Sequence, residues 1–257
     1  MTSPQHTVDQ APGAQESDIA RILSIDIGGT GLKAAVLDPN GEMLTERLRV
    51  ETPHPCIPEA LLKSLTELIE PLSDFDCVSV GFPGVVREGK IITAPNLGTA
   101  DLKNFDLRFA LEKQLGKPVQ VLNDADMQGY AAIKGTGVEI VITLGTGFGS
   151  ALFFNGQIAP HLEISQIQFR KGETFDEQLG DKARKKVGKK QWNRRVRRAI
   201  STLRTLSNFD SLYIGGGNAD RINFGLDPDV QIIPNECGVR GGAWLWSKRR
   251  PAEPPRG

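Results

Sequence analysis

The stretch Ile25-Asp26-Ile27-Gly28-Gly29-Thr30 has a second copy in this chain, Ile142-Thr143-Leu144-Gly145-Thr146-Gly147. Each copy runs from an apolar strand into a glycine-rich turn, and after a further strand comes an Asn-Gly hairpin signal, at Asn40-Gly41 and Asn155-Gly156. Glycine suits such turns because it tolerates positive φ and has no Cβ to keep backbone amides away from an anion. One such loop is weak evidence. Two copies after apolar strands predict two phosphate loops that face one another.

The composition is that of a globular protein without a strong overall electrostatic field. The chain has 257 residues, 39% of them hydrophobic, and its 31 basic residues balance 31 acidic ones, so net charge favours neither nucleic acid nor a membrane as partner. Residues 1–20 lack a basic start and an apolar run, so we expect a disordered tail there rather than a signal peptide or spanning helix.

The cysteines and histidines offer no metal-ligand spacing. Three cysteines are too few and too scattered for a disulfide framework or a zinc site, which predicts a reducing, cytoplasmic location. The three histidines are interpreted as structural or incidental. These residues are Cys56, Cys77 and Cys237, and His6, His54 and His161.

Strand-like and helix-like periods alternate along the chain, which predicts an α/β fold. The first half is expected to contain strands at 21–27, 32–37, 43–50, 76–82, 91–94 and 119–122, and helices at 58–70 and 105–115. The second half is expected to contain strands at 139–144, 149–154, 212–214 and 231–233, and helices at 125–133, 182–206 and 238–246. The apolar stripe of the long helix is Trp192, Val196, Ala199, Ile200, Leu203 and Leu206.

Asn123 and Asp124 follow the strand at 119–122, at the strand edge where α/β folds place ligands. Taken alone, Asp124 is more simply interpreted as the N-cap of the helix that follows, because Asp is a favoured N-cap. The surrounding motifs reverse that preference.

Five motifs, in order, resemble those of the ROK kinases of the sugar kinase, hexokinase and actin-like superfamily, and of their glucokinases that include polyphosphate-dependent forms. They are the phosphate loops Asp26-Ile27-Gly28-Gly29-Thr30 and Leu144-Gly145-Thr146-Gly147, the sugar-side turn Gly81-Phe82-Pro83-Gly84, the catalytic pair Asn123-Asp124, and the base-side step Gly215-Gly216-Gly217. The resemblance covers roughly residues 21–247 and implies two ribonuclease-H-like lobes around a central cleft. The implied lobes are 21–122 and 123–237, and the terminal helix of 238–257 packs back on the first lobe.

The resemblance also implies a chemistry, which is phosphoryl transfer with Mg²⁺ from polyphosphate or ATP to the 6-hydroxyl of glucose. Asp124 is then the general base that accepts the hydroxyl proton, and Asp26 orients Mg²⁺ through water without ligating it directly. Phosphate and nucleotide contacts fall on Gly28, Gly29, Thr30, Lys33, Gly145, Thr146, Gly147, Gly215, Gly216 and Gly217. The cysteine-rich zinc motif of many relatives is absent, so we expect no zinc, and the resemblance implies a homodimer.

The sugar side departs from the family pattern. Many ROK kinases carry Glu-x-Gly-His where this chain reads Glu163-Ile164-Ser165-Gln166, so glutamine is interpreted as replacing the histidine, with hydrogen bonding retained. A second family glutamate falls on Asp176 or Glu177. Such changes shift sugar preference, which leaves another hexose open. The predicted sugar contacts are Asn96, Asn123, Glu163, Gln166 and Asp176.

The segment 182–198 is strongly basic and allows three interpretations. It is either a solvated helix face or a polyphosphate track, since polyphosphate glucokinases have related basic segments at this position. The third interpretation is a nucleic-acid site, which no recognised binding motif supports. The residues of the track are Lys185, Lys186, Lys189, Lys190 and Arg194.

A function from another class also stays open, namely a non-catalytic sugar-binding or regulatory relative that has lost turnover. ROK repressors carry a helix-turn-helix before the kinase-like domain, and residues 1–20 have no room for one.

Overall fold

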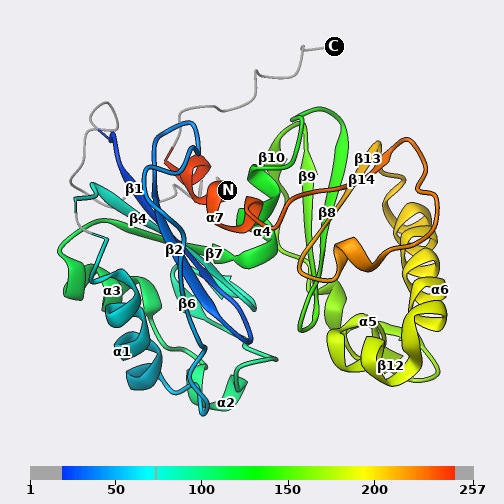
Figure 1. Ribbon diagram of the computed structural model, residues 1–257, viewed down its shortest axis with the longest axis horizontal. Coiled ribbons are helices and arrows are strands. Elements are labelled where there is room, and N and C mark those ends of the chain that lie inside the picture. The colour runs from blue at the N-terminus through cyan, green and yellow to red at the C-terminus, as the bar shows by residue number, and fades with distance from the viewer. Residues whose placement is uncertain (1–18, 73, 247–257) are drawn as a thin grey trace, which may run out of the picture.

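The computed structural model describes residues 19–72 and 74–246, which form two lobes, each built on a five-stranded mixed sheet (Figure 1). The predicted tail therefore lies almost wholly outside the described residues. The first lobe contains β1 (Ile22–Ile27), β2 (Leu32–Leu37), β3 (Leu48–Val50), α1 (Pro58–Ile69), β4 (Cys77–Phe82), β5 (Val86–Arg87), β6 (Lys90–Ile91), α2 (Thr99–Leu102), α3 (Leu107–Leu115) and β7 (Val119–Asn123). No helix in the described part of the chain combines the length and apolar character needed to cross a bilayer.

The first sheet has the order β3-β2-β1-β4-β7. β1 pairs with β2 in an antiparallel hairpin and with β4 in parallel. Both faces of β1 are covered, which suits its nearly continuous apolar sequence. Leu23, Ile25 and Ile27 pack in one cluster with buried residues of α1 and α3, whereas Ile22 packs on the opposite face with the end of the chain.

The second lobe repeats this plan around the order β10-β9-β8-β13-β14. Ile140 and Ile142 pack against Trp192 of the long helix, while Val141 packs on the opposite face with Ala125. This part of the chain contains α4 (Asp124–Tyr130), β8 (Val138–Leu144), β9 (Phe148–Phe154), β10 (Gln157–Ile158), η1 (Ile164–Gln166), β11 (Gln168–Arg170), β12 (Glu173–Thr174), α5 (Phe175–Leu179), α6 (Asp181–Ser207), β13 (Ser211–Gly215), η2 (Ala219–Arg221) and β14 (Val230–Ile232).

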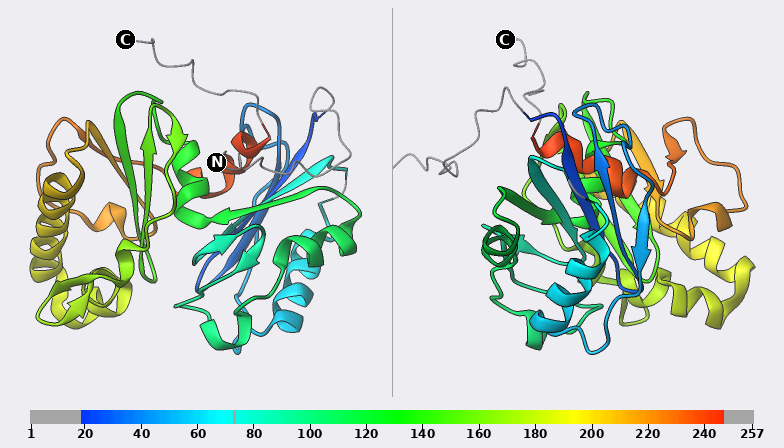
Figure 2. Two further views of the ribbon diagram at one scale, coloured as in Figure 1. Left: turned by 180° about the vertical axis from the view of Figure 1, so that it is seen from behind. Right: turned by 60° about the vertical axis from the view of Figure 1, so that its left-hand side comes forward.

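The end of the described chain returns from the second sheet to the first, where the red segment in Figure 2 lies beside the blue strands. Ser24 Oγ donates to the carbonyl of Val239, and Ser79 Oγ donates to that of Gly242, both at 2.6 Å. A Cβ at Gly241 would overlap the carbonyl oxygen of Met127 in α4, so glycine is required for this approach. The segment consists of α7 (Cys237–Arg240) and the 3₁₀ helix η3 (Gly241–Leu245).

Several predicted elements are wrong in extent. The strand expected at 43–50 is reduced to β3, the one at 91–94 to the end of β6, and the helix at 125–133 ends at Tyr130. The single helix expected at 238–246 is a short α-helical turn followed by a 3₁₀ helix, because its three glycines favour helix poorly.

The long basic helix also differs from its prediction. Gly188 interrupts α6 with φ 77° and ψ 166°, a left-handed φ that glycine adopts readily, so two helical segments meet there. Trp192 and Leu203 are buried as expected, but Leu206 is 61% exposed near the end of the helix and does not belong to the packed stripe.

Candidate active site

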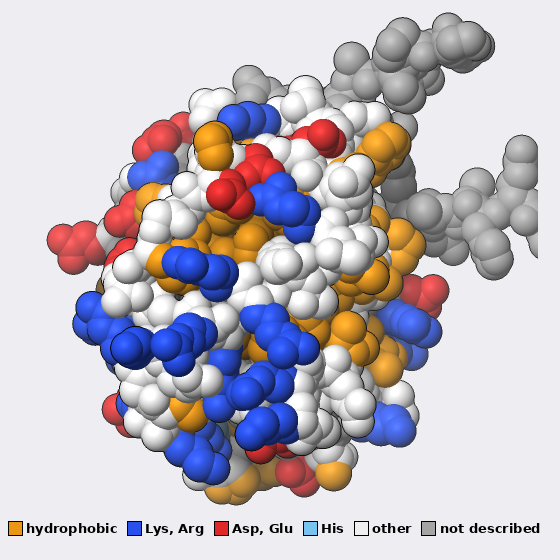
Figure 3. Space-filling model, turned by 90° about the vertical axis from the view of Figure 1, so that its right-hand side faces the viewer, with side chains coloured by type: hydrophobic (Ala, Val, Ile, Leu, Met, Phe, Trp, Pro, Cys, Tyr) orange, Lys and Arg blue, Asp and Glu red, His pale blue; other side chains and the backbone are white. Residues whose placement is uncertain are grey.

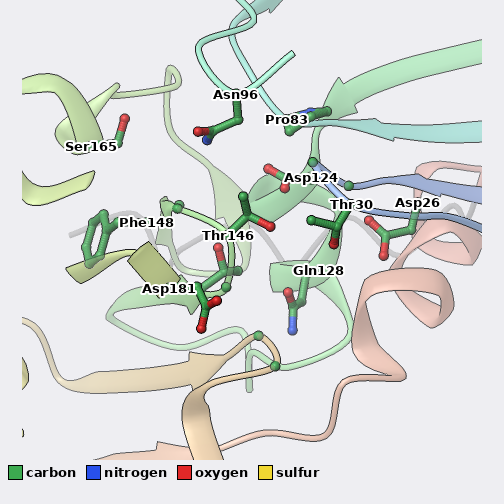
Figure 4. Close-up of a pocket in the computed structure, with 18 of the residues that line it drawn as sticks. Asp26, Thr30, Pro83, Asn96, Asp124, Gln128, Thr146, Phe148, Ser165 and Asp181 are labelled. Carbon is green, nitrogen blue, oxygen red and sulfur yellow. The ribbon is translucent and has the colours of Figure 1, made fainter. Parts of the chain in front are cut away.

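Between the lobes lies a cleft of about 500 Å³ that both glycine-rich turns line (Figure 4). The turns face one another, because a Cβ on Gly29 would stand 3.2 Å from Cγ2 of Thr146. Each turn is closed by its own backbone, with Gly28 donating to the carbonyl of Gly31 at 3.0 Å and Gly145 to that of Gly147 at 2.9 Å. The predicted loops that line the cleft contribute Gly28, Gly29, Thr30, Gly145, Thr146 and Gly147.

Asp26 and Lys33 lie beside the first loop and form a pair. Lys33 Nζ is 2.6 Å from Asp26 Oδ2, and both residues line the cleft from the hairpin β1–β2. The predicted lysine is therefore held beside the first glycine-rich turn by an ion pair.

Asn123 caps helix α4 and thereby frees Asp124. The Oδ1 atom of Asn123 accepts from Ala125 N at 2.8 Å and from Asp126 N at 3.2 Å, while its Nδ2 faces the carbonyls of Phe82 and Gly84. The helix-cap interpretation thus belongs to Asn123. Asn123 also lines the cleft, and its predicted sugar contact stays a prediction.

Asp124 stands as the first residue of α4 with its carboxylate in the cleft. It accepts one hydrogen bond, from the backbone of Ala125 at 2.8 Å. Burial, and next the nearby Asp26 carboxylate, raises the pKa of Asp124 from its ordinary 3.8 to about 7. A carboxylate with this pKa is suited to accept a proton near neutral pH.

His161, which the sequence analysis interpreted as structural or incidental, lines the cleft. Its Nδ1 atom is 3.1 and 3.0 Å from the two carboxylate oxygens of Asp126, and its side chain is 11% exposed. Its Nε2 is 3.8 Å from Glu163 Oε2, too far for a hydrogen bond, and within the described residues both atoms are buried without a partner. Both residues line the cleft, so these two polar atoms lie within its wall.

The protonation of His161 follows from its neighbours. Burial opposes the charged imidazole, but the hydrogen bond to Asp126 and the nearby Glu163 carboxylate outweigh it and raise the pKa of His161 to about 10. Burial also raises the pKa of Asp126. Because two carboxylates face one imidazole, the proton belongs on His161. The signal that could have found the site is the spacing of His161 and Glu163, since alternate residues of an extended segment share a side.

Gln166 is a corrected prediction. Its side chain is exposed, donates to Ser165 Oγ at 2.9 Å, and is not among the residues that line the cleft. The 3₁₀ turn η1 carries Gln166 away from the cleft, and Ser165 lines the cleft instead, hydrogen-bonded to Glu163.

Asp176, not Glu177, faces the cleft wall. Asp176 Oδ1 accepts from Phe148 N at 2.7 Å, and the carboxylate also accepts from the amide of Asn96, which does line the cleft. Burial raises the pKa of Asp176. Glu177 is occupied by a capping box with Thr174. Asp176 therefore orients Asn96 from behind.

The comparison with known proteins agrees with this arrangement. A family model described as "ROK family" matches residues 22–160, more than half of the chain.

The chain belongs to the ROK family.

Its relatives include a polyphosphate glucokinase from Mycobacterium tuberculosis (strain CDC 1551 / Oshkosh), 29% identical over 260 residues that cover 95% of this chain and 97% of the relative. A crystal structure of inorganic polyphosphate/ATP-glucomannokinase from Arthrobacter sp. strain KM is 31% identical, covers 88% of this chain and 98% of that one, and has a TM-score of 0.81. A ROK family glucokinase from Streptomyces griseus, in complex with glucose and AMPPNP, shares the fold at 20% identity, with a TM-score of 0.70 over 88% of this chain and 99% of that one. The family and the two-lobed fold predicted from the sequence are confirmed.

The basic segment of this ROK chain begins at the cleft. Lys185 lines it and pairs with Asp181 at 2.6 Å. Lys and Arg side chains gather across the face that carries α6 (Figure 3). The kink at Gly188 separates Lys185 and Lys186 from the cations that follow it, so the predicted row does not follow one continuous helix. The exposed members of the predicted track are Lys185, Lys186, Lys189, Lys190 and Arg194.

Three further findings complete the cleft of the ROK chain. Gly216 and Gly217 line it, whereas Gly215 of the predicted step lies behind them against Gln128. Arg49 of β3, which the sequence did not single out, also lines it and donates to the carbonyl of Thr30 at 3.2 Å. In the described residues, no three His, Cys, Asp or Glu side chains form a group that could hold a metal ion.

Proposed function

We propose that this ROK chain is a sugar kinase that transfers a phosphoryl group from polyphosphate or ATP to the 6-hydroxyl of glucose or a related hexose. The observation that carries the proposal is Asp124, a lightly bonded carboxylate with a pKa near 7 in a cleft lined by two phosphate loops. Relatives named polyphosphate glucokinase and polyphosphate/ATP-glucomannokinase support the choice of donors and sugar.

In this mechanism the sugar oxygen forms a bond to phosphorus as the bond from phosphorus to the bridging oxygen of the donor breaks. The hydroxyl proton passes to the Asp124 carboxylate, which the cap at Asn123 holds in place. His161, Glu163 and Asn96 orient the sugar, and the two loops hold the donor phosphates through backbone amides.

Mg²⁺ would enter with the donor phosphates. Asp26 presents a carboxylate beside the first loop, and one of its oxygens is taken by Lys33, which fits a metal held mainly by phosphate and water. When bound, the metal neutralises charge on the transferred group. The homodimer and cytoplasmic location expected from the sequence are part of the proposal and are tested by sedimentation and by fractionation of the source cells.

The proposal is tested by hexose 6-phosphate formation with Mg²⁺, run in parallel with ATP and long-chain polyphosphate. Glucose, mannose and N-acetylglucosamine serve as acceptors. We expect turnover of glucose with at least one donor. Sugar binding without turnover for any donor and acceptor pair would contradict the kinase and favour the non-catalytic relative.

The basic segment yields a prediction about the donor. Reversing three charges with Lys186→Glu, Lys189→Glu and Lys190→Glu should raise the KM for long-chain polyphosphate about tenfold or more and flatten its salt dependence, because fewer counterions are released. The KM for ATP should change by less than about twofold, because a short donor does not extend past the cleft. Steady-state kinetics between low and moderate salt measure both effects.

The control for this prediction carries the same charge change elsewhere. Lys103→Glu, Lys113→Glu and Lys117→Glu alter three exposed lysines of the first lobe. If both triple variants raise the polyphosphate KM equally, the segment is a solvated face and not a track.

A further inference from the structure

Gln128 is a buried polar residue that the mechanism above does not use. It lies on α4 four residues after Asp124, so the two side chains share one face of the helix. Its exposure is 6%, and it lines the cleft. Figure 4 shows its amide in the same cavity as Thr30, Asp124 and Thr146.

The amide of Gln128 is unpaired. Among the described residues, whose unprinted interactions concern only Ala94 and Trp244, its side chain has no hydrogen bond. A glutamine amide carries two donors and two acceptor sites. The amide atoms of Gln128 are not sealed inside the protein but line the cleft, so their unused donors and acceptors are open to a ligand there.

The surroundings of Gln128 place that ligand on the phosphate side. A Cβ at Gly215 would overlap the Nε2 atom of Gln128, so glycine at the end of β13 leaves the space that the amide fills. In Figure 4, Gln128 lies across Asp124 from Asn96 and Ser165, which belong to the sugar side. The amide thus stands near the donor loops and the Gly216-Gly217 step.

We infer that the Gln128 amide donates to a non-bridging oxygen of the donor phosphate that becomes the leaving group. This inference rests on the proposed function and deepens it. In a loose transition state, charge moves onto the leaving phosphate as its bond to the transferred group breaks. A neutral donor placed there strengthens as that charge develops and keeps its proton at every pH at which the protein is folded.

The test compares Gln128→Ala and Gln128→Glu with the control Gln231→Ala, which removes an exposed glutamine side chain from the edge strand β14. Gln128→Ala should lower kcat/KM for the donor about tenfold or more, as expected for a hydrogen bond to a charged group, and leave the sugar KM within about twofold. Gln128→Glu should be more damaging because its carboxylate repels phosphate. A change confined to the fold would move both KM values together.

A second measurement separates this inference from the proposed function. Tripolyphosphate with Mg²⁺ and no sugar should raise the melting temperature of the unsubstituted protein and of Gln231→Ala, but raise that of Gln128→Ala much less. If the unsubstituted protein binds tripolyphosphate and turns over no sugar, the kinase proposal fails while Gln128 is still tested. An unchanged donor KM and melting shift in Gln128→Ala would overturn the inference. The inference would also be overturned if Gln128→Glu satisfied the Mg²⁺ requirement more tightly than glutamine does, because the side-chain oxygen would then be binding the metal.

Discussion

Asp124→Asn is expected to lower kcat by about 10²–10⁴-fold, the usual contribution of a positioned general base, while the sugar still binds. The substitution keeps the shape of the side chain, and Asn123 continues to cap α4, so the helix and the cleft persist. Steady-state kinetics and calorimetric titration with glucose measure the two effects. Asp220→Asn, an exposed aspartate of η2, is the control and should retain full activity. Turnover of Asp124→Asn close to that of the control would contradict the base assignment.

The pH dependence gives the same assignment a second test. Because the base must be ionised, kcat/KM should fall about tenfold per unit as pH drops below the Asp124 pKa of about 7. The residual activity of Asp124→Asn should not show this fall in kcat/KM at low pH. Stability moves in the opposite sense. Burial raises the pKa of Asp124 in the folded state from 3.8, so the folded chain holds this proton more tightly and loses stability as pH rises from about 4 to 7. Asp124→Asn should therefore be the more stable protein at pH 8, and the difference should vanish near pH 4, as measured by urea unfolding.

Asp126→Ala is expected to lower the free energy of unfolding by about 3–5 kcal/mol at pH 6, because it leaves the buried His161 imidazolium without its partner. It should also raise the KM for sugar, since the imidazole loses the partner that orients it. Urea unfolding and steady-state kinetics measure these effects. Asp126→Asn retains a hydrogen-bond partner and should cost less.

The matched control for this prediction breaks an ion pair at the surface. Asp227→Ala removes one exposed partner of Arg204, which keeps Asp229, and should cost less than about 1 kcal/mol. Equal losses of unfolding free energy in Asp126→Ala and Asp227→Ala would show that the buried pair stabilises the fold no more than the surface pair does. The pH profile is distinctive, because a folded-state pKa of about 10 lies above the ordinary 6.5. The stability supplied by Asp126 is fully present below about pH 6.5 and is lost as pH rises through about 10.

Local patterns in the sequence predicted the parts of the site that are themselves local. The two glycine turns follow apolar strands, and Asn123-Asp124 ends β7. Strand order brings Asn123-Asp124 and the first turn to one edge of the first sheet, and the packing of the second lobe adds the second turn to the same cleft. Asp126 and His161 are 35 residues apart, and nothing in either segment states that they meet. Their contact depends on how α4 packs against β8 and β9. The aspartate that follows Asn123 looked like a cap, and only the backbone geometry shows that the asparagine has that role.

The errors in the basic segment have a similar cause. The periodic pattern on both sides of Gly188 predicts one helix, because a lone glycine inside such a pattern is usually tolerated. The left-handed φ at Gly188 changes the direction in which the basic side chains point, although the periodic pattern of the sequence is the same on both sides of it. Gln128 was overlooked because a glutamine on a short helix is unremarkable in sequence; its significance comes from Gly215, 87 positions later, which makes room for it.

The return of the last segment to the first sheet makes the second lobe an insertion. Ile19, near one end of the described chain, and Trp246, at the other, pack against the same cluster of Ile22, Ala35, Leu37, Cys77, Val239 and Ala243. The chain leaves the first lobe once, near Asn123, and re-enters it once, near Cys237. The inserted lobe is thus covalently joined to the first lobe at both of its ends, so the two crossings near Asn123 and Cys237 both limit how far the lobes can separate.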